Sequence, residues 1–69
     1  MPFRVELEKE DDGRWIADVP ALPGCLAYGD TREDAFARVV ALALHVIAER
    51  IEHGEAAPEL VRSVFEIAA

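Results

Sequence analysis

The chain has 69 residues, which is enough for one small domain that buries roughly 60% of the surface exposed by its unfolded form. Hydrophobic residues make up 52% of the chain, and 14 acidic against 7 basic side chains give a net charge of −7. This charge argues against direct binding of nucleic-acid phosphates and would attract a basic protein partner, although it also serves to keep a small, apolar-rich domain soluble.

The N-terminus and the cysteine content bear on the compartment. Charged residues interrupt MPFRVELEKE, so it is not a signal peptide, and the single Cys25 excludes an intramolecular disulfide. The apolar stretch 35–48 contains Arg38 and His45 and is shorter than the ~20 residues that a membrane span needs. We therefore expect a cytoplasmic protein that has no membrane contact.

Two strands are predicted near the N-terminus. Residues 3–8 alternate between apolar and charged side chains, which is typical of a strand with one buried face. Asp12-Gly13 suits the positive φ angles of a tight hairpin turn. A second antiparallel strand, with Trp15 and Ala17 on one face, is expected to end at about Val19.

A corner and a third strand follow. Pro20 ends the second strand, and Leu22-Pro23-Gly24-Cys25 fits a type II turn, with Pro and Gly at its two central places. Leu22 either plugs the open end of the core or is exposed as a partner contact. The short segment 25–29 then predicts a third strand, in which Tyr28 lies at the core edge or in an interface.

A long helix is predicted from about Thr31 to His53. Asp30 and Thr31 offer oxygens for its N-cap, and Gly54 ends it. At 1.5 Å per residue the helix is ~35 Å long, whereas strands of five or six residues span ~17 to 20 Å. Its C-terminal half should therefore overhang the sheet.

The apolar residues of this helix cover an unusually wide part of its circumference. Leu42 and Val46 widen a stripe that is broad enough already to face a core, and a chain of this length cannot bury both flanks. We interpret Leu42 and Val46, together with Ile51 on the overhang, as a self-association or partner surface of a dimer or tetramer. The broad apolar stripe that they widen comprises Phe36, Val39, Val40, Ala43, Leu44, Ile47 and Ile51.

Residues 63–68 alternate again and predict a fourth strand. The fold class is therefore α+β, with a single-layer, mainly antiparallel sheet, one long helix on one face, and the order β-β-β-α-β.

No catalytic residue, metal site or cofactor is predicted. Asp11, Asp12 and Asp18 resemble a carboxylate cluster, but turn geometry and strand alternation explain their positions, and we regard them as acidic, partner-facing candidates. His45 and His53 lie eight residues apart, which is not the spacing of a zinc-binding pair. Cys25 follows Pro-Gly in a corner, where packing is the common role of a cysteine.

The stretch VPALPGCLAYGDTREDA, residues 19–35, resembles the HicB-like antitoxin family, whose members carry a V-P-x-L-P-G-C turn, a short strand and a G-D-T-x-E-E-A-like helix start. The pattern extends over nearly the whole chain. The resemblance implies a partial ribonuclease-H-like domain that binds and blocks HicA, a small basic ribonuclease. The family's C-terminal DNA-binding segment has no counterpart before Ala69, so we expect a single domain over residues 1–69 that does not bind nucleic acid directly.

Two hypotheses follow. The first is a non-enzymatic, HicB-like antitoxin domain that occludes the active site of a HicA-type toxin. The alternative is a small acidic metal-binding protein or a vestigial ribonuclease-H-like enzyme, for which Asp18 would be the critical ligand.

Overall fold

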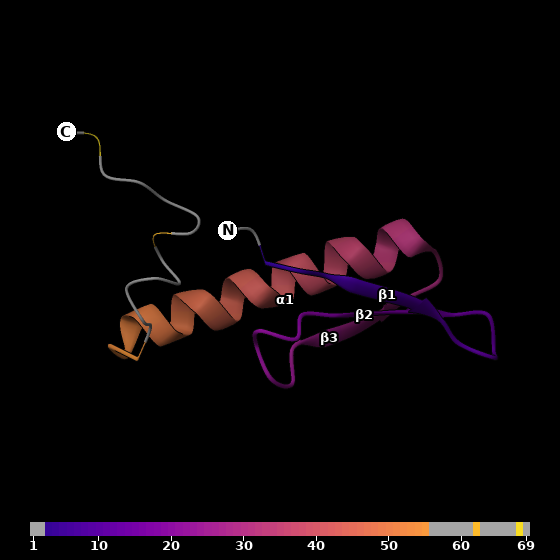
Figure 1. Ribbon diagram of the computed structural model, residues 1–69, viewed down its shortest axis with the longest axis horizontal. Helices are drawn as coiled ribbons and strands as arrows, with labels where there is room; N and C mark the ends of the chain where they lie inside the picture. The colour runs from indigo at the N-terminus through magenta and orange to yellow at the C-terminus, as the bar shows by residue number, and fades with distance from the viewer. Residues whose placement is uncertain (1–2, 56–61, 63–67, 69) are drawn as a thin grey trace.

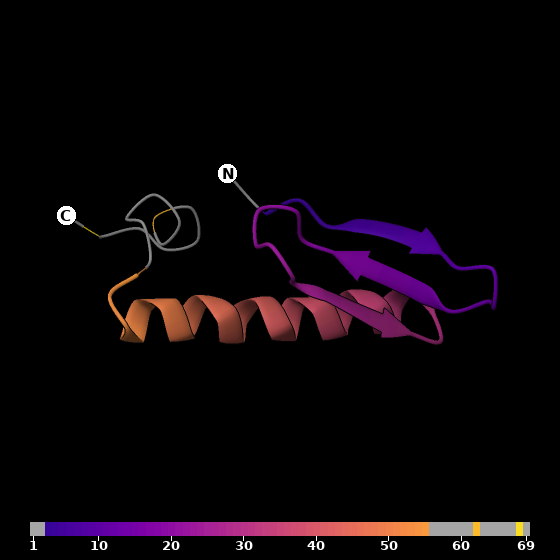
Figure 2. The same ribbon diagram turned by 90° about the horizontal axis from the view of Figure 1, so that it is seen from below.

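The computed structural model describes residues 3–55, 62 and 68. Its elements are β1 (Glu6–Lys9), β2 (Trp15–Asp18), β3 (Leu26–Gly29) and α1 (Arg32–Glu52). The strands form one antiparallel sheet in the order β1-β2-β3, and α1 lies against one face of it (Figures 1 and 2). The predicted succession of three strands and a helix is confirmed. The fourth strand predicted at 63–68 lies outside the described residues.

The β1–β2 hairpin closes through a three-residue loop, Asp11–Gly13. The Glu10 amide donates to the Arg14 carbonyl at 2.7 Å, and the Gly13 amide donates to the Glu10 carbonyl at 3.0 Å. Gly13 has a φ of 91°, whereas no residue other than glycine has a positive φ in the described part of the chain. The expected pair of positive φ angles at Asp12-Gly13 is therefore wrong, because only the glycine adopts one.

The corner between β2 and β3 is tied by its own backbone. The Cys25 amide donates to the Leu22 carbonyl at 2.9 Å, and Gly24 has a φ of 83°, as the third place of a type II turn requires. The Val19 amide donates to the Cys25 carbonyl at 3.0 Å. Leu22 is fully buried, so it plugs the core and is not available to a partner.

The core is the layer between α1 and the inner face of the sheet. From α1, every fourth residue between Ala35 and Ile47 is buried. The side chains of Ala17 and Val19 meet them from the sheet, and those of Leu22 and Cys25 from the corner. Alanine at several of these places lets the helix approach the sheet closely. Trp15, which the sequence assigns to the core face, is only half-buried there.

The start of α1 is held very close to β3. A Cβ atom on Gly29 would overlap the backbone nitrogen of Ala35 and would lie 2.8 Å from the Cβ of Asp34. Two residues after Gly29, the Thr31 hydroxyl caps the helix by accepting a hydrogen bond from the Asp34 amide at 3.1 Å. The φ angle of Gly29 is not positive, so backbone conformation does not require glycine there. Glycine is required because a side chain has no space.

The C-terminal half of α1 extends beyond the sheet, as predicted (Figure 2). The helix ends at Glu52 with His53 as its C-cap, and Gly54 follows with a φ of 68°. One part of the predicted core stripe is wrong: Phe36 is 47% exposed and Leu44 is 56% exposed. Both lie on the flank of α1 next to β1, where no other described segment covers them.

We predict that Gly29→Ala destabilises the domain by about 2 to 3 kcal/mol, because the added methyl group pushes the first turn of α1 away from β3. Gly54→Ala is the matched comparison. A Cβ at residue 54 meets no atom within 4 Å, so only the positive φ opposes it, at about 1 kcal/mol. Urea unfolding of the two variants measures both losses, and a smaller loss for Gly29→Ala would contradict the close contact.

We also predict a protected thiol at Cys25. Burial raises the pKa of this thiol above its ordinary value, and the Asp18 carboxylate adds to the increase. The thiolate fraction at neutral pH is therefore below that of a free cysteine. Alkylation by iodoacetamide should be more than about tenfold slower in the native protein than in the urea-unfolded chain. Equal rates would indicate a reactive cysteine.

Candidate functional site: the outer face of the sheet

The face of the sheet that points away from α1 carries both charged and apolar side chains. The register places Glu6 opposite Asp18 and Asp18 opposite Leu26, and it places Glu8 opposite Ile16 and Ile16 opposite Tyr28. Because side chains alternate across a strand, all of these point to one side. The outer face thus consists of Glu6, Glu8, Ile16, Asp18, Leu26 and Tyr28.

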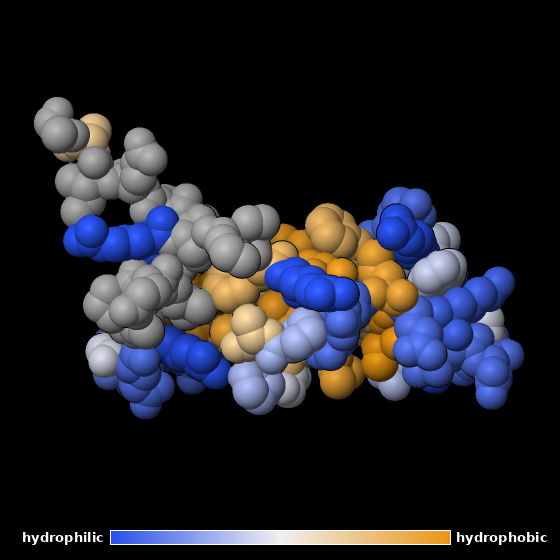
Figure 3. Space-filling model, viewed as in Figure 1, coloured by the Kyte–Doolittle hydropathy of each residue, from blue (hydrophilic) through white to orange (hydrophobic). Residues whose placement is uncertain are grey.

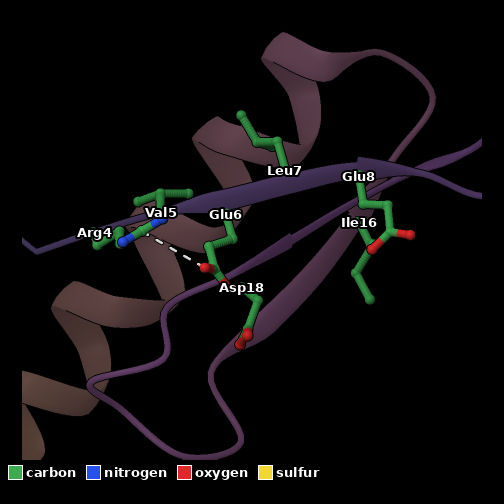
Figure 4. A pocket seen from close by; sticks show the side chains of 7 residues that line it. All are labelled: Arg4, Val5, Glu6, Leu7, Glu8, Ile16 and Asp18. Carbon is green, nitrogen blue, oxygen red and sulfur yellow. Dashed lines mark ion pairs between the residues drawn. The ribbon is translucent and has the colours of Figure 1, made fainter.

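The β1 side of the outer face is acidic. Glu6 and Asp18 lie side by side on neighbouring strands, and Glu8 lies further along β1 beside Ile16 (Figure 4). These side chains line an open hollow of about 500 Å³. The Arg4 guanidinium is 3.6 Å from the Glu6 carboxylate, but the pair is largely exposed and contributes little to stability. Directly opposed carboxylates repel each other, so this half attracts cations.

The β3 side of the outer face is apolar. Leu26 is 42% exposed and Tyr28 is 39% exposed, and the half-buried Ile16 adjoins both halves. The Arg14 guanidinium lies over the Tyr28 ring, 4.6 Å from its centroid. The Asp12 carboxylate accepts a hydrogen bond from the Arg14 side chain at 2.8 Å. These contacts hold the tyrosine ring in place, consistent with its predicted role at an interface.

The acidic candidates from the sequence do not form one cluster. Asp11 and Asp12 lie in the hairpin loop, whereas Asp18 lies at the opposite end of β2, beside Glu6. Hydrogen bonds from the Arg14 backbone amide and side chain hold the pKa of the Asp12 carboxyl below its ordinary value. Asp12 is thus already paired, and Asp18 is the only one of the three on the outer face.

No arrangement of three or more His, Cys, Asp or Glu side chains within the described residues is suited to a metal ion. The Cys25 sulfur lies 4.0 Å from the Val39 carbonyl oxygen inside the core, so substrate has no access to it. His53 Nδ1 is 2.8 Å from the Glu49 carbonyl oxygen at the end of α1, which makes it a helix-capping group. Among the described helices, none has the length and apolarity to cross a membrane.

Two separate apolar areas flank α1. On one flank, Leu42 is 37% exposed, while the neighbouring Val46 is half-buried and packs against the core. Ile51, which is 46% exposed, lies nine residues after Leu42 and therefore on the opposite side of the helix, in line with Leu44. On the β1 side, Phe36 and Leu44 line a groove of about 220 Å³. Figure 3 shows hydrophobic side chains gathered where β1 and α1 lie side by side. The exposed apolar surface of the helix is therefore greater on this flank than on the flank of Leu42.

Four residues of the outer face are absent from the sequence-based candidates. They are Glu6, Glu8, Ile16 and Leu26. The alternation of residues 3–8 does place Glu6 and Glu8 on the polar face of β1. However, only the register of the hairpin, which depends on its three-residue loop, shows that Glu6 faces Asp18.

Comparison with known proteins gives two related archaeal proteins. A UPF0150 protein of Thermoplasma acidophilum is 33% identical over 58 residues, which cover 84% of each chain. A UPF0150 protein of Archaeoglobus fulgidus is 33% identical over 57 residues, 80% of this chain and 83% of the relative. Searches of family models and of solved structures give no significant match. At this identity and coverage, the chain belongs to the UPF0150 family.

Proposed function

We propose that this UPF0150 protein is a HicB-like, antitoxin-type binding protein that neutralises a small basic ribonuclease of the HicA type. The proposal combines the resemblance of residues 19–35 to HicB-like antitoxins with the properties of the outer face. The single observation that carries it is the pair of opposed carboxylates, Glu6 and Asp18, on a sheet face that no described segment covers.

Neutralisation follows from competition for the same cations. A ribonuclease binds the phosphates of RNA through Lys and Arg side chains, and these must surround its active site. The carboxylates of Glu6, Glu8 and Asp18 offer those side chains an alternative set of anions. Once the domain is bound to the ribonuclease, it sterically excludes RNA from the active site of that enzyme. In this mechanism the antitoxin needs neither a metal ion nor a catalytic residue of its own.

We predict that the protein inhibits RNA cleavage by the small basic protein encoded beside it. The double variant Glu6→Lys/Glu8→Lys should weaken inhibition by at least about tenfold, because like charges then meet across the interface. Cleavage of a fluorescent RNA at increasing antitoxin concentration measures the effect.

Glu49→Lys/Glu52→Lys is the control, since it changes the net charge equally on exposed residues of α1. It should inhibit like the wild type. If the two double variants lose inhibition equally, the effect depends on net charge and the outer face is not the binding site. Absence of both binding and inhibition by the wild-type protein would contradict the proposed function.

We also propose that the protein self-associates through the flank of α1 that carries Leu42. Leu42→Glu should convert a dimer or tetramer into a monomer, because it places a charge within a buried apolar contact. Light scattering after size-exclusion chromatography measures the mass. Ala37→Glu, which alters an exposed residue on another side of the same helix, should keep the wild-type mass. A wild-type protein that elutes with the mass of one chain would contradict the proposal.

A further inference from the structure

The division of the outer face into two halves restricts the shape and polarity of what can dock there. The acidic side chains of Glu6 and Glu8 project from β1, and the apolar side chains of Leu26 and Tyr28 project from β3. The central strand contributes one of each kind, Asp18 and Ile16. The outer face is therefore charged at β1 and apolar at β3, so its polarity changes from strand to strand and not along the length of each strand.

The width of the face fits one helix. Neighbouring strands lie ~4.8 Å apart, so the axes of β1 and β3 are separated by ~10 Å. An α-helix with its side chains is ~10 to 12 Å across. An antiparallel sheet commonly leaves the face opposite its helix to solvent, so the exposed apolar side chains of Leu26 and Tyr28 on that face call for a partner.

The stacking of Arg14 on Tyr28 determines which way round a partner element can dock on the outer face. The Arg14 guanidinium already occupies one side of the Tyr28 ring, so a second cation cannot stack there, whereas the β1 side has three carboxylates and the exposed Arg4. A docked element must therefore place its basic side chains over β1. Because Arg14 is held by Asp12, the Tyr28 ring loses little conformational freedom when its remaining surface is covered.

We propose that the outer face binds an amphipathic α-helix of the partner protein, with Lys or Arg on the flank over β1 and aliphatic side chains on the flank over β3. This inference rests on the proposed function, because it specifies which part of a basic partner makes the contact. It differs from that function in naming the secondary structure and the polarity of the contact, and these can be tested without the ribonuclease.

The test uses two synthetic peptides with the full-length protein. The first is an 18-residue helix-forming peptide with Lys on one flank and Leu on the other. The second has the same composition in an order that spreads Lys and Leu evenly around the helix. Titration followed by ¹H–¹⁵N correlation spectra should show changes at the amides of the outer-face strands with the first peptide only. Leu26→Ser should lower the affinity of the protein for the first peptide about tenfold. Leu44→Ser, which removes an even more exposed leucine from α1, should leave the affinity of the first peptide unchanged.

The outcomes separate the two proposals. Equal binding of both peptides, or spectral changes confined to α1 and the groove beside Phe36, would overturn the helix-docking inference even if the protein inhibits the ribonuclease. Selective binding of the amphipathic peptide to the outer face would support the inference even if no ribonuclease is inhibited, and the proposed function alone would then fail.

Discussion

The contact between Gly29 and Ala35 determines how the rest of the molecule is arranged. With no side chain at residue 29, the first turn of α1 lies directly against the end of β3. The helix then continues along the inner face of the sheet, where Val39, Ala43 and Ile47 meet the strands. A single helix can cover only one face of a sheet. Within residues 3–55 no segment covers the outer face, so its exposed charged and apolar side chains can contact a partner.

The corner before β3 makes this division of faces possible. Leu22 fills the end of the core, and the thiol of Cys25 packs against the backbone of Val39 where the chain reverses direction. The reversal fixes the register of β3 against β2 and sets Tyr28 opposite Ile16. The motif that carries the resemblance to HicB-like antitoxins is therefore a packing device. Under the proposed function it contributes to binding indirectly, by placing the apolar half of the outer face.

Local signals in the sequence were sufficient for most of the fold. Gly13, the Pro-Gly pair of the corner and Thr31 each act within a few residues, and alternation identified the strands. The candidate site was predicted less well, since its residues meet only through long-range pairing: the Glu6–Asp18 pair depends on the hairpin register. Helical periodicity also assigned Phe36 to the core, because periodicity gives the direction of a side chain but not whether another segment covers it.

The central claim is that the carboxylates of the outer face, and not those elsewhere on this acidic surface, bind the basic partner. Carbodiimide cross-linking of the complex, followed by mass spectrometry, tests it directly, because this reagent joins carboxylates to lysines in direct contact. The account predicts that cross-links to the partner arise at Glu6, Glu8 or Asp18. Cross-links confined to Glu49 and Glu52 of α1, with none on the outer face, would contradict it.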